Sequence, residues 1–456
     1  MNLVRHLPRF QRAYRALDEL AARESWSRSQ IEEYQLGRIN QLWKHAAQHV
    51  PYYQRLCRTH DLPRRFESVE HFQQSVPLLP KQEVNHNPLQ FFSENADRGS
   101  WTSTSGSSGK PTRFFSGATG HQEMLRTRYR YYAMWDIDIF DRTVYLWGQS
   151  SVFLHGWERR LAALRQRLND RLRGRLRLPA YHLAPETLRD YLRQIERFQP
   201  ASIYGYSNAT HLLAEEALAE QYRCASLKLI TVTSEPATEA MRAKITEAFG
   251  VPAVVEYGAS ECGVIASQWP DGQLRVREDV VLVETLPDDD GRYQLVITPL
   301  YNPSFPLIRY AIGDLTDRAL QKPAQGFATL GNILGRDNDL IVTRTGRVIH
   351  PTLLEGIFEH DLFDQVRCFK IHQQADGALD VQLELKEPTA SVDVLPVVRE
   401  FTELVEGYPI DVQIVPKIAT TVAGKHRWIV SDLAQQLQEQ ERSARHPACV
   451  TTAGRV

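Results

Sequence analysis

A run of small hydroxylated residues that ends in a lysine is the first candidate for chemistry in this chain. Residues 103–111 read Ser-Thr-Ser-Gly-Ser-Ser-Gly-Lys-Pro. Serine and glycine disfavour helix and strand, but they let backbone N–H groups and hydroxyls approach a polyphosphate closely. Lys110 adds a mobile positive charge. We therefore predict a phosphate-binding loop made of Ser103, Thr104, Ser105, Gly106, Ser107, Ser108, Gly109 and Lys110.

A flexible linker has a similar composition, and the P-loop of common NTPases has a similar function. The run lies between Trp101 and Arg113-Phe114-Phe115, and these apolar flanks favour a loop held by a core over a linker. A P-loop requires a glycine five residues before Gly-Lys and then Ser or Thr. This chain has Thr104 and Pro111 at those positions, so the P-loop pattern is absent.

Carboxylates follow two later apolar runs that we expect to be strands. Glu256-Tyr257-Gly258-Ala259-Ser260-Glu261 combines an aromatic ring, a glycine, a hydroxyl and a carboxylate within a few positions. A carboxylate at a strand end, opposite a polyphosphate loop, suits Mg²⁺. Asp314 follows a glycine in Arg309-Tyr310-Ala311-Ile312-Gly313-Asp314. It could accept hydrogen bonds from ribose hydroxyls, or it could be an ordinary turn residue.

Three shorter segments have structural explanations as well as functional ones. Thr233-Ser234-Glu235-Pro236 is typical of a helix N-cap with an acid in the first turn. Gly335-Arg336-Asp337-Asn338-Asp339 is polar and turn-forming, and it reads as a bend between domains from which Arg336 could reach a nucleotide. Gly424-Lys425-His426-Arg427 is as typical of a surface turn as of a functional lysine.

Length and composition limit the classes of protein to consider. The 456 residues suggest two or three domains, and 42% hydrophobic residues suffice for a core. A net charge of −1 provides no electrostatic footprint for nucleic acid or anionic membrane. No long apolar run or signal peptide is visible, and the five cysteines are dispersed. We expect a cytoplasmic protein that binds neither nucleic acid nor membrane, as a monomer or homodimer.

Two different patterns of secondary structure position these motifs. Residues 1–90 are predicted to be mainly helical, with a helix that ends before Pro51. Between residues 143 and 257 buried strands alternate with helices, which predicts a mostly parallel sheet covered on both faces, with ligands beyond the carboxyl ends of its strands. Arg159–Leu178 is read as an arginine-dense helix, either with a solvated face or as an anion-binding surface.

From Asp279 the pattern becomes β-rich. Val280–Leu286 and Tyr293–Thr298, joined by a turn, predict a hairpin. Residues 337–435 are predicted to form a small α+β domain after a large domain at 91–336, and residues 436–456 a disordered tail. The predicted fold class is therefore α/β, with a β-rich subdomain and a small C-terminal domain.

Taken in chain order, six motifs resemble those of the adenylate-forming (acyl-CoA synthetase) superfamily, in its phenylacetate–CoA ligase and CapK-like branch. The resemblance covers about residues 43–430, and it rests on the loop at 103–111, Ser-Glu-Pro at 234–236, Tyr-Gly-x-Ser-Glu at 257–261, Arg-Tyr-x-x-Gly-Asp at 309–314, Gly-Arg at 335–336 and Gly-Lys-x-Arg at 424–427. Val50–Tyr53 and Leu78-Leu79-Pro80-Lys81 resemble the N-terminal region of CapK-like proteins, and we assign them no chemistry.

The resemblance implies a role for each matching residue. Ser103–Lys110 and Ser260 would contact the ATP phosphates, Glu261 would hold Mg²⁺, and Lys425 would swing in on a lid domain, hinged at Asp337–Asp339, to stabilise attack on the α-phosphate. Adenine and ribose would be bound by Ser234, Glu235, Pro236, Glu256, Tyr257, Gly258, Asp314 and Arg336. The acyl pocket would be lined by Trp147, His155, Tyr204, Gly205, Tyr206 and Ala259, which are equally typical of an ordinary core.

The implied activity is ATP- and Mg²⁺-dependent activation of a small aromatic or apolar carboxylic acid, followed by transfer to CoA. The alternatives are transfer to an amine, which gives an amide, and a non-catalytic nucleotide-binding relative. Some relatives carry a Cys/His zinc cluster after the motif glutamate, but only Cys262 is near here, so we expect no zinc. The central hinge position holds Asn338 where relatives usually have an acid, and the segment around Lys425 is reduced.

Overall fold

A computed structural model of the chain describes residues 8–103, 112–147, 168–180, 183–235, 237–288, 291–336, 341–345, 348–349, 365–385, 387, 393–418, 429–434 and 436. The chain divides into two compact units, one of Met1–Ile333 and one that begins at Leu334. Several predicted site residues lie outside the described residues: Thr104–Lys110, His155, Pro236, the hinge Asp337–Asp339, and Lys425.

The N-terminal region is helical, as predicted. It contains α1 (Pro8–Arg23), α2 (Arg28–His49), α3 (Pro51–His60), α4 (Val69–Ser75), α5 (Lys81–His86) and a 3-10 turn, η2 (Pro88–Phe91). Ser27 caps α2, because its side chain accepts a hydrogen bond from Gln30 N while the Gln30 side chain accepts one from Ser27 N. Val50 ends α2 in an extended conformation and Pro51 begins α3, which confirms the predicted boundary.

The first unit is built around a seven-stranded sheet with the order β10-β9-β8-β7-β6-β4-β5. The five strands β5, β4, β6, β7 and β8 run parallel, and β9 and β10 add an antiparallel edge. The strand bounds are β4 (Thr143–Trp147), β5 (Arg175–Pro179), β6 (Ser202–Tyr206), β7 (Leu229–Thr233), β8 (Ala253–Ala259), β9 (Gly263–Gln268) and β10 (Leu274–Val276). The mostly parallel sheet predicted from the alternation is confirmed.

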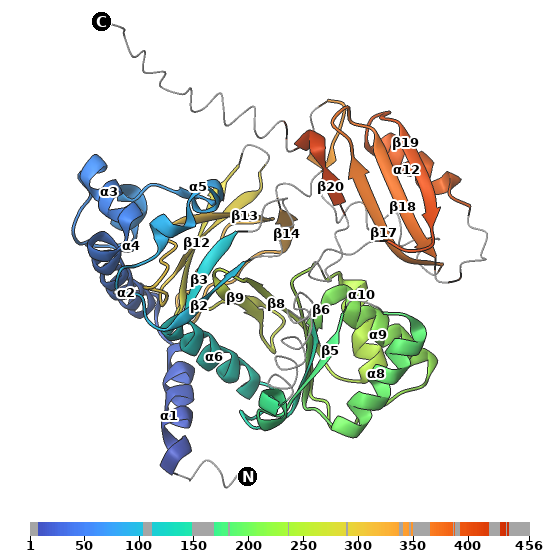
Figure 1. Cartoon of the computed structure of the whole chain (residues 1–456), viewed down its shortest axis with the longest axis horizontal. Helices are drawn as coiled ribbons and strands as arrows, with labels where there is room; N and C mark the ends of the chain where they lie inside the picture. The colour runs from blue at the N-terminus through green and yellow to red at the C-terminus, as the bar shows by residue number, and fades with distance from the viewer. Residues whose placement is uncertain are drawn as a thin grey trace, which may run out of the picture. The chain divides into compact units, whose positions relative to one another are not determined.

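Helices cover both faces of this sheet. Figure 1 shows α8 (Pro185–Phe198), α9 (Ser207–Ala219) and α10 (Glu239–Phe249) together on one side of β5 and β6, with α6 (Ala118–Ala133) on the other. The prediction that Arg159–Leu178 is helical is wrong at its end, because Arg175–Pro179 pairs with β4 as strand β5. Gly174 has a φ of 62°, a left-handed conformation that stops the preceding helical turns at residue 172.

The two faces of the parallel strands differ in chemistry. Successive side chains of a strand point to opposite faces. One face is aliphatic, and Val144, Leu146, Ile203, Ile230 and Val232 form a core there with α8, α9 and α10. The other face, which we call the polar face, carries Tyr145, Trp147, Tyr204, Thr231, Thr233 and Glu256. It lies under α6, whose Tyr131 and Tyr132 pack against Leu229 and Val254.

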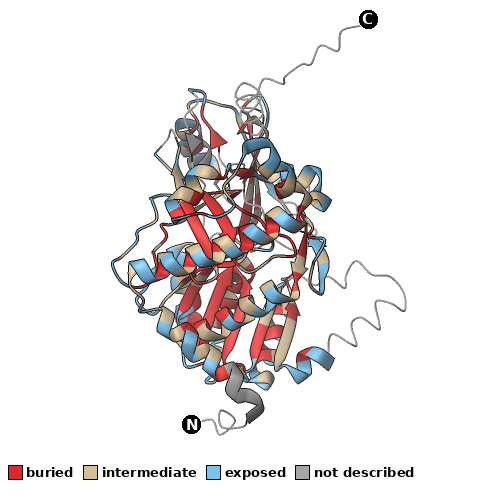
Figure 2. Ribbon diagram, turned by 90° about the vertical axis from the view of Figure 1, so that its left-hand side faces the viewer, coloured by how far each residue is buried: buried red, intermediate tan, exposed pale blue. Residues whose placement is uncertain are grey.

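A second sheet completes the first unit. Its strands are ordered β1-β13-β12-β11, with bounds β1 (Leu79–Pro80), β11 (Val281–Pro287), β12 (Tyr293–Pro299) and β13 (Tyr310–Thr316). Antiparallel pairing of β11 with β12 confirms the predicted hairpin. A separate hairpin of β2 (Gly99–Ser103) and β3 (Arg113–Gly117) flanks the predicted phosphate loop, and Ser103 pairs with Arg113 at its base. Figure 2 shows most strands in red, the colour of buried residues, and helices with exposed outer faces.

The second unit is a small α+β domain. Its sheet has the order β19-β18-β17-β20, with bounds β17 (Val366–Gln373), β18 (Leu379–Leu385), β19 (Ile410–Val415) and β20 (Ile429–Ser431). Helix α12 (Leu395–Leu404) supplies Phe401 to its core, and β15 (Ile341–Val342) pairs with β16 (Val348–Ile349). Strand β14 (Ile333–Arg336) spans the change from the first unit to the second. In the described part of the chain no helix is both long enough and apolar enough to span a membrane.

Candidate functional site

A pocket in the first unit connects the stem of the predicted phosphate loop to the turn between β8 and β9. The space within it that no atom fills measures about 630 Å³, part of which is open to solvent. Phe114 and Ser116 line it from β3, the strand that directly follows the loop, and Ser260 and Glu261 line it from the turn. The remaining wall is formed by the end of β3, by α6, by the β8–β9 turn with the start of β9, and by segments that flank β11 and β12 of the second sheet: Gly117, Gly120, His121, Glu123, Met124, Thr127, Cys262, Gly263, Val264, Val280, Pro299, Tyr301 and Asn302.

Glu261 occupies this pocket in a tight turn. Cys262 N donates to Ala259 O at 3.1 Å, and Gly258 approaches the next strand so closely that a Cβ there would lie 2.5 Å from Gly263 O. Glycine is therefore required at position 258 for the turn that projects Glu261. The Glu261 side chain is only 3% exposed. Its Oε1 accepts a hydrogen bond from the Tyr310 hydroxyl at 3.2 Å.

Lys81 is a member of this site that the sequence analysis missed. Its Nζ lies 3.8 Å from Glu261 Oε1, and its side chain is 15% exposed. Leu79 of β1 pairs with Tyr310 of β13, so Lys81, the first residue of α5, begins its helix beside the acid. The sequence feature that could have indicated Lys81 is its position directly after the proline of a short apolar run. That run lies in a segment to which we assigned no chemistry. The ammonium group compensates the charge of a nearly buried carboxylate.

Tyr257 and Asp314 join the two sheets of the first unit. The Tyr257 hydroxyl donates to Asp314 Oδ2 at 2.7 Å, and the two residues are 9% and 8% exposed. The register between β12 and β13 shifts beside Asp314, where Gly313 adopts a φ of 84°. Such irregularities turn a strand residue away from its regular direction, and here the acid meets a tyrosine of the other sheet. The two motifs thus converge, as the prediction of a shared nucleotide site requires.

Glu256 is held by two residues at the polar face. Its Oε1 accepts a hydrogen bond from the Tyr204 hydroxyl at 2.6 Å and lies 3.5 Å from Arg128 Nη2. Arg128 also donates to the Tyr204 hydroxyl at 3.3 Å, and its Cζ lies 4.7 Å from the centre of that ring. Burial, and then the charge of Glu256, raise the pKa of Tyr204 far above its usual value, so this tyrosine stays protonated. The carboxylate predicted to face adenine is therefore held by a tyrosine and an arginine.

Glu235 caps a helix other than the one expected. Its Oε2 accepts a hydrogen bond from Asn208 N, in the first turn of α9, at 3.1 Å. Helix α10, which follows the motif, is instead capped by Thr238, whose Oγ1 accepts from Met241 N at 3.0 Å. The simple N-cap interpretation of Ser234-Glu235 is therefore wrong for α10. Ser234 has a φ of 71°, a left-handed backbone conformation that is uncommon outside glycine.

The residues predicted to line the acyl pocket form an aromatic group at the ends of β4 and β6. The rings of Trp147 and Tyr204 stack with centres 5.5 Å apart, and those of Trp147 and Tyr206 lie 4.3 Å apart. Gly205 serves packing on the aliphatic side, because a Cβ there would lie 2.5 Å from Thr210 Oγ1. Ala259 accepts the hydrogen bond that closes the turn before Glu261. Arg336 ends β14, and its side chain lies outside the described residues.

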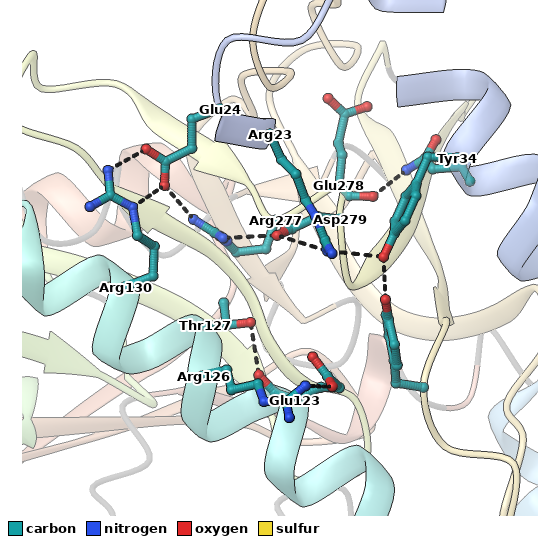
Figure 3. A network of polar contacts seen from close by, with 12 residues as sticks. Arg23, Glu24, Tyr34, Glu123, Arg126, Thr127, Arg130, Arg277, Glu278 and Asp279 are labelled. Atoms are coloured by element: carbon teal, nitrogen blue, oxygen red, sulfur yellow. Dashed lines mark hydrogen bonds and ion pairs between the residues drawn. The ribbon is translucent and has the colours of Figure 1, made fainter. Parts of the chain in front are cut away.

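Helix α6, which lines the pocket and also packs on the polar face, is fixed from outside by the network in Figure 3. Arg130 donates from Nε and Nη2 to the two carboxylate oxygens of Glu24, at 2.8 and 2.6 Å. Glu24 also lies 3.5 Å from Arg277 Nη1, and Arg277 Nη2 donates to Asp279 at 3.1 Å. This network connects α6 to the end of α1 and to the segment before β11. The position of α6 is thus set by ion pairs on its outer side as well as by Arg128 on its inner side.

The donor set around Glu261 fits Mg²⁺ in the way that nucleotide enzymes use it. Mg²⁺ typically takes one or two carboxylates and completes its shell with phosphate oxygens and water. Glu261 offers a hard carboxylate in a pocket, where its Oε1 is also contacted by Tyr310 and Lys81, and Asp314 accepts a hydrogen bond from Tyr257. Among the described residues, no three His, Cys, Asp or Glu side chains gather as a metal cluster. A metal at Glu261 would therefore depend on phosphates for most of its ligands.

Comparison with known proteins points to one family. No family model matches the chain. Protein CapK from Staphylococcus aureus is 22% identical over 413 residues, which cover 88% of this chain and 89% of CapK. Phenylacetate-coenzyme A ligase from Thermus thermophilus is 31% identical over 196 residues, and that from Pseudomonas putida is 29% identical over 182 residues. These two matches cover 38% and 37% of this chain, and 44% and 40% of the relatives.

The fold is also that of a solved ligase. A crystal structure of 2-hydroxyisobutyryl-CoA ligase in the postadenylation state, in complex with 2-HIB-AMP, matches with a TM-score of 0.69. The match covers 92% of this chain and 94% of the ligase at 20% sequence identity. It shows that the α/β fold is shared.

Proposed function

Because the chain belongs to the adenylate-forming superfamily, in its CapK and phenylacetate–CoA ligase branch, we propose that it uses ATP to activate a carboxylic acid as an acyl-adenylate. Pyrophosphate leaves in this step, and the acyl group then passes to CoA as a thioester. One observation carries the proposal. Ser260 and Glu261 share a pocket with β3, the strand that directly follows the predicted phosphate loop.

In this proposal each engaged residue binds or orients one part of ATP. Asp314, held by the Tyr257 hydroxyl, accepts hydrogen bonds from the ribose. Ser103–Lys110 and Ser260 bind the phosphates, and Arg336 assists at the ribose. The motif residues Ser234, Glu235, Pro236, Glu256 and Gly258 form the surroundings of the adenine.

The chemical step brings like charges together, since a carboxylate attacks a triphosphate. Mg²⁺ held at Glu261 would supply positive charge to the phosphates when it is bound. Lys81 keeps the Glu261 carboxylate in place through its ion pair at 3.8 Å. Lys425 would donate to the oxygens of the reacting phosphate in a site that excludes water, where such an interaction is worth several kcal/mol. A lid that then moves would admit the acceptor.

CoA is the acceptor that the relatives favour, since the phenylacetate-coenzyme A ligases and the solved 2-hydroxyisobutyryl-CoA ligase are named for it. Transfer to an amine would use the same adenylate and the same first half-reaction. The acyl part of the substrate would contact the aromatic group of Trp147, Tyr204 and Tyr206. These rings suit a flat or apolar acyl group.

The test is a panel of carboxylic acids assayed for pyrophosphate release, with and without CoA. We expect ATP- and Mg²⁺-dependent release with at least one acid, an acyl-AMP detectable by mass spectrometry without CoA, and an acyl-CoA when CoA is added. If an amide forms with an added amine and no thioester forms with CoA, the acceptor is an amine and the proposed adenylation still holds. ATP binding without pyrophosphate release from any acid would contradict the proposed activity.

A further inference from the structure

The polar face and the side of α6 that packs on it carry more hydrogen-bond donors than their neighbours use. Among the described residues, Arg128 Nε, the Tyr132 hydroxyl and the Thr231 hydroxyl are buried without a hydrogen-bond partner. Thr231 is adjacent to Tyr204 in the β6–β7 register, and Arg128 contacts that same tyrosine. A buried polar group without a partner costs about 1–3 kcal/mol. Two such groups beside Tyr204, with that of Tyr132 one helical turn after Arg128, indicate a place where a ligand supplies the missing acceptor atoms.

Positive charge exceeds negative charge on this side of α6. Arg175 and Arg177 of β5 lie with Cζ 5.5 and 5.4 Å from the centre of the Tyr145 ring, which in turn contacts Tyr204. Arg177 is paired with Asp170 at 2.8 Å. In the described part of the chain no carboxylate lies within ion-pair distance of Arg175. The acid that pairs with Arg128 there is Glu256, at 3.5 Å, and the excess positive charge on this side is that of Arg175.

The charges of arginines near α6 affect His121, a residue of the pocket wall. Burial, and then the charges of Arg128, Arg173 and Arg175, hold the pKa of His121 below its usual value. His121 is one of the residues that line the pocket with Ser260 and Glu261. The charges of these arginines therefore reach the wall of the pocket where the reacting carboxylate would lie, a wall that Glu123 and Glu261 also line.

We propose that the acid activated at this site carries a second carboxylate, and that Arg128 binds it. This inference rests on the proposed adenylation and names its substrate class. The guanidinium fork matches a carboxylate in shape, and a carboxylate supplies acceptors only, as the unpartnered donors require. The small apolar acid expected from the sequence would leave these donors without partners.

The helix sets the distance between the two carboxylates of the substrate. Met124 lines the pocket beside Ser260, and Arg128 lies four residues further along α6. Four residues of α-helix correspond to about 6 Å along its axis. The substrate must span roughly this distance beside the rings of Trp147 and Tyr204. A rigid aromatic diacid such as 4-carboxyphenylacetate fits, whereas malonate, whose carboxylates share one carbon, is too short.

The experiment compares matched acids in wild-type protein and in Arg128→Met. The readout is kcat/KM for pyrophosphate release with 4-carboxyphenylacetate relative to phenylacetate, together with the Kd of each acid from calorimetry. We expect wild type to prefer the diacid by at least about tenfold, because a site built for an acceptor discriminates strongly against its absence. Arg128→Met should abolish that preference, and Arg128→Lys should restore part of it. Arg126→Met removes the same charge from a half-exposed position of α6 and should leave the ratio unchanged.

The outcomes separate this inference from the proposed function. Pyrophosphate release with phenylacetate but no preference for the diacid, or an unchanged ratio in Arg128→Met, would overturn the inference and leave adenylation intact. If no acid supports release, the proposed activity fails, and calorimetry decides the inference separately. Equal Kd values for 4-carboxyphenylacetate in wild type and Arg128→Met would then overturn it. If Arg128→Met does not fold, the Lys variant and the wild-type ratio of the two acids provide the same test.

Discussion

Replacing Tyr257 by phenylalanine tests the contact that joins the two sheets at the candidate site. The hydroxyl donates to Asp314 at 2.7 Å, and both side chains are more than nine-tenths buried. Phenylalanine keeps the ring and its packing, so the substitution removes a hydrogen bond without opening a cavity at the ring. The change in unfolding free energy therefore reports on the hydrogen bond itself.

The expected loss follows from the charge and burial of the acceptor. A hydrogen bond to a charged group contributes about 1.5–3 kcal/mol, and a buried carboxylate that loses a donor bears most of its desolvation cost. We expect Tyr257→Phe to lower the free energy of unfolding of the first unit by this amount. We also expect it to raise KM for ATP more than it lowers kcat, because Asp314 would no longer be held toward the ribose.

The assay is urea unfolding followed by tryptophan fluorescence, carried out as a double-mutant cycle. Tyr257→Phe, Asp314→Asn and the double variant should show a coupling energy of about 1–1.5 kcal/mol, because asparagine can still accept the bond and the cycle reports the difference between a charged and a neutral acceptor. Tyr293→Phe is the matched control: this strand tyrosine is partly exposed, and its hydroxyl has no hydrogen-bond partner among the described residues. It should leave stability unchanged.

Additive effects in this cycle would refute the reasoning. If Tyr257→Phe unfolded at the wild-type urea concentration while Asp314→Asn was destabilised, the carboxylate would be stabilised by other groups. If the variant lost stability but kept the wild-type KM for ATP, the Tyr257–Asp314 hydrogen bond would stabilise the fold and have no role in nucleotide binding.

The other predictions concern the metal, the lysine assigned to the chemical step and a buried ion pair. Glu261→Ala should weaken Mg·ATP binding, and a Mg²⁺ titration like that of wild type would remove this residue from the metal site. Lys425→Ala should abolish carboxylate-dependent pyrophosphate release while ATP still binds in equilibrium dialysis; unchanged turnover would show that another group acts. Arg309 donates to both oxygens of Glu284, at 3.0 and 2.8 Å, and Arg309→Met should cost about 3–5 kcal/mol in urea unfolding. Burial raises the pKa of Glu284 although Arg309 lowers it, so stability should fall as pH rises from about 4.3 through the raised pKa, and Glu284→Gln should flatten that slope.

The strands of the first unit could be predicted because their signals are local. Strands β4, β6, β7 and β8 all lie within residues 143–257, where buried strands were expected to alternate with helices. Each is a short run rich in β-branched or aromatic residues, bounded by residues that stop a strand. The hairpin of β11 and β12 could be found for the same reason, since its turn residues lie between two apolar runs.

Strand β5 could not be found in this way. Arg175, Leu176, Arg177 and Leu178 continue a charged sequence with good helix propensity. They become a strand because Gly174 stops the helix and β4 offers its edge, and neither effect is visible within the window itself. Tertiary pairing overrides propensity here. Lys81 was missed for a related reason, since its partner Glu261 is distant in sequence and the two meet only through the pairing of β1 with β13.

The polar face shows what a closer analysis of the sequence could have extracted. Strands buried on both faces of a parallel sheet are expected to be apolar throughout. Instead Val144-Tyr145-Leu146-Trp147 and Ile230-Thr231-Val232-Thr233 alternate between aliphatic residues and residues that carry a polar group. Solvent cannot explain the alternation, because Thr231 is fully buried beside α6. In a sheet covered on both sides, such a pattern identifies the face whose polar groups need hydrogen-bond partners, and here we propose a ligand as one of them.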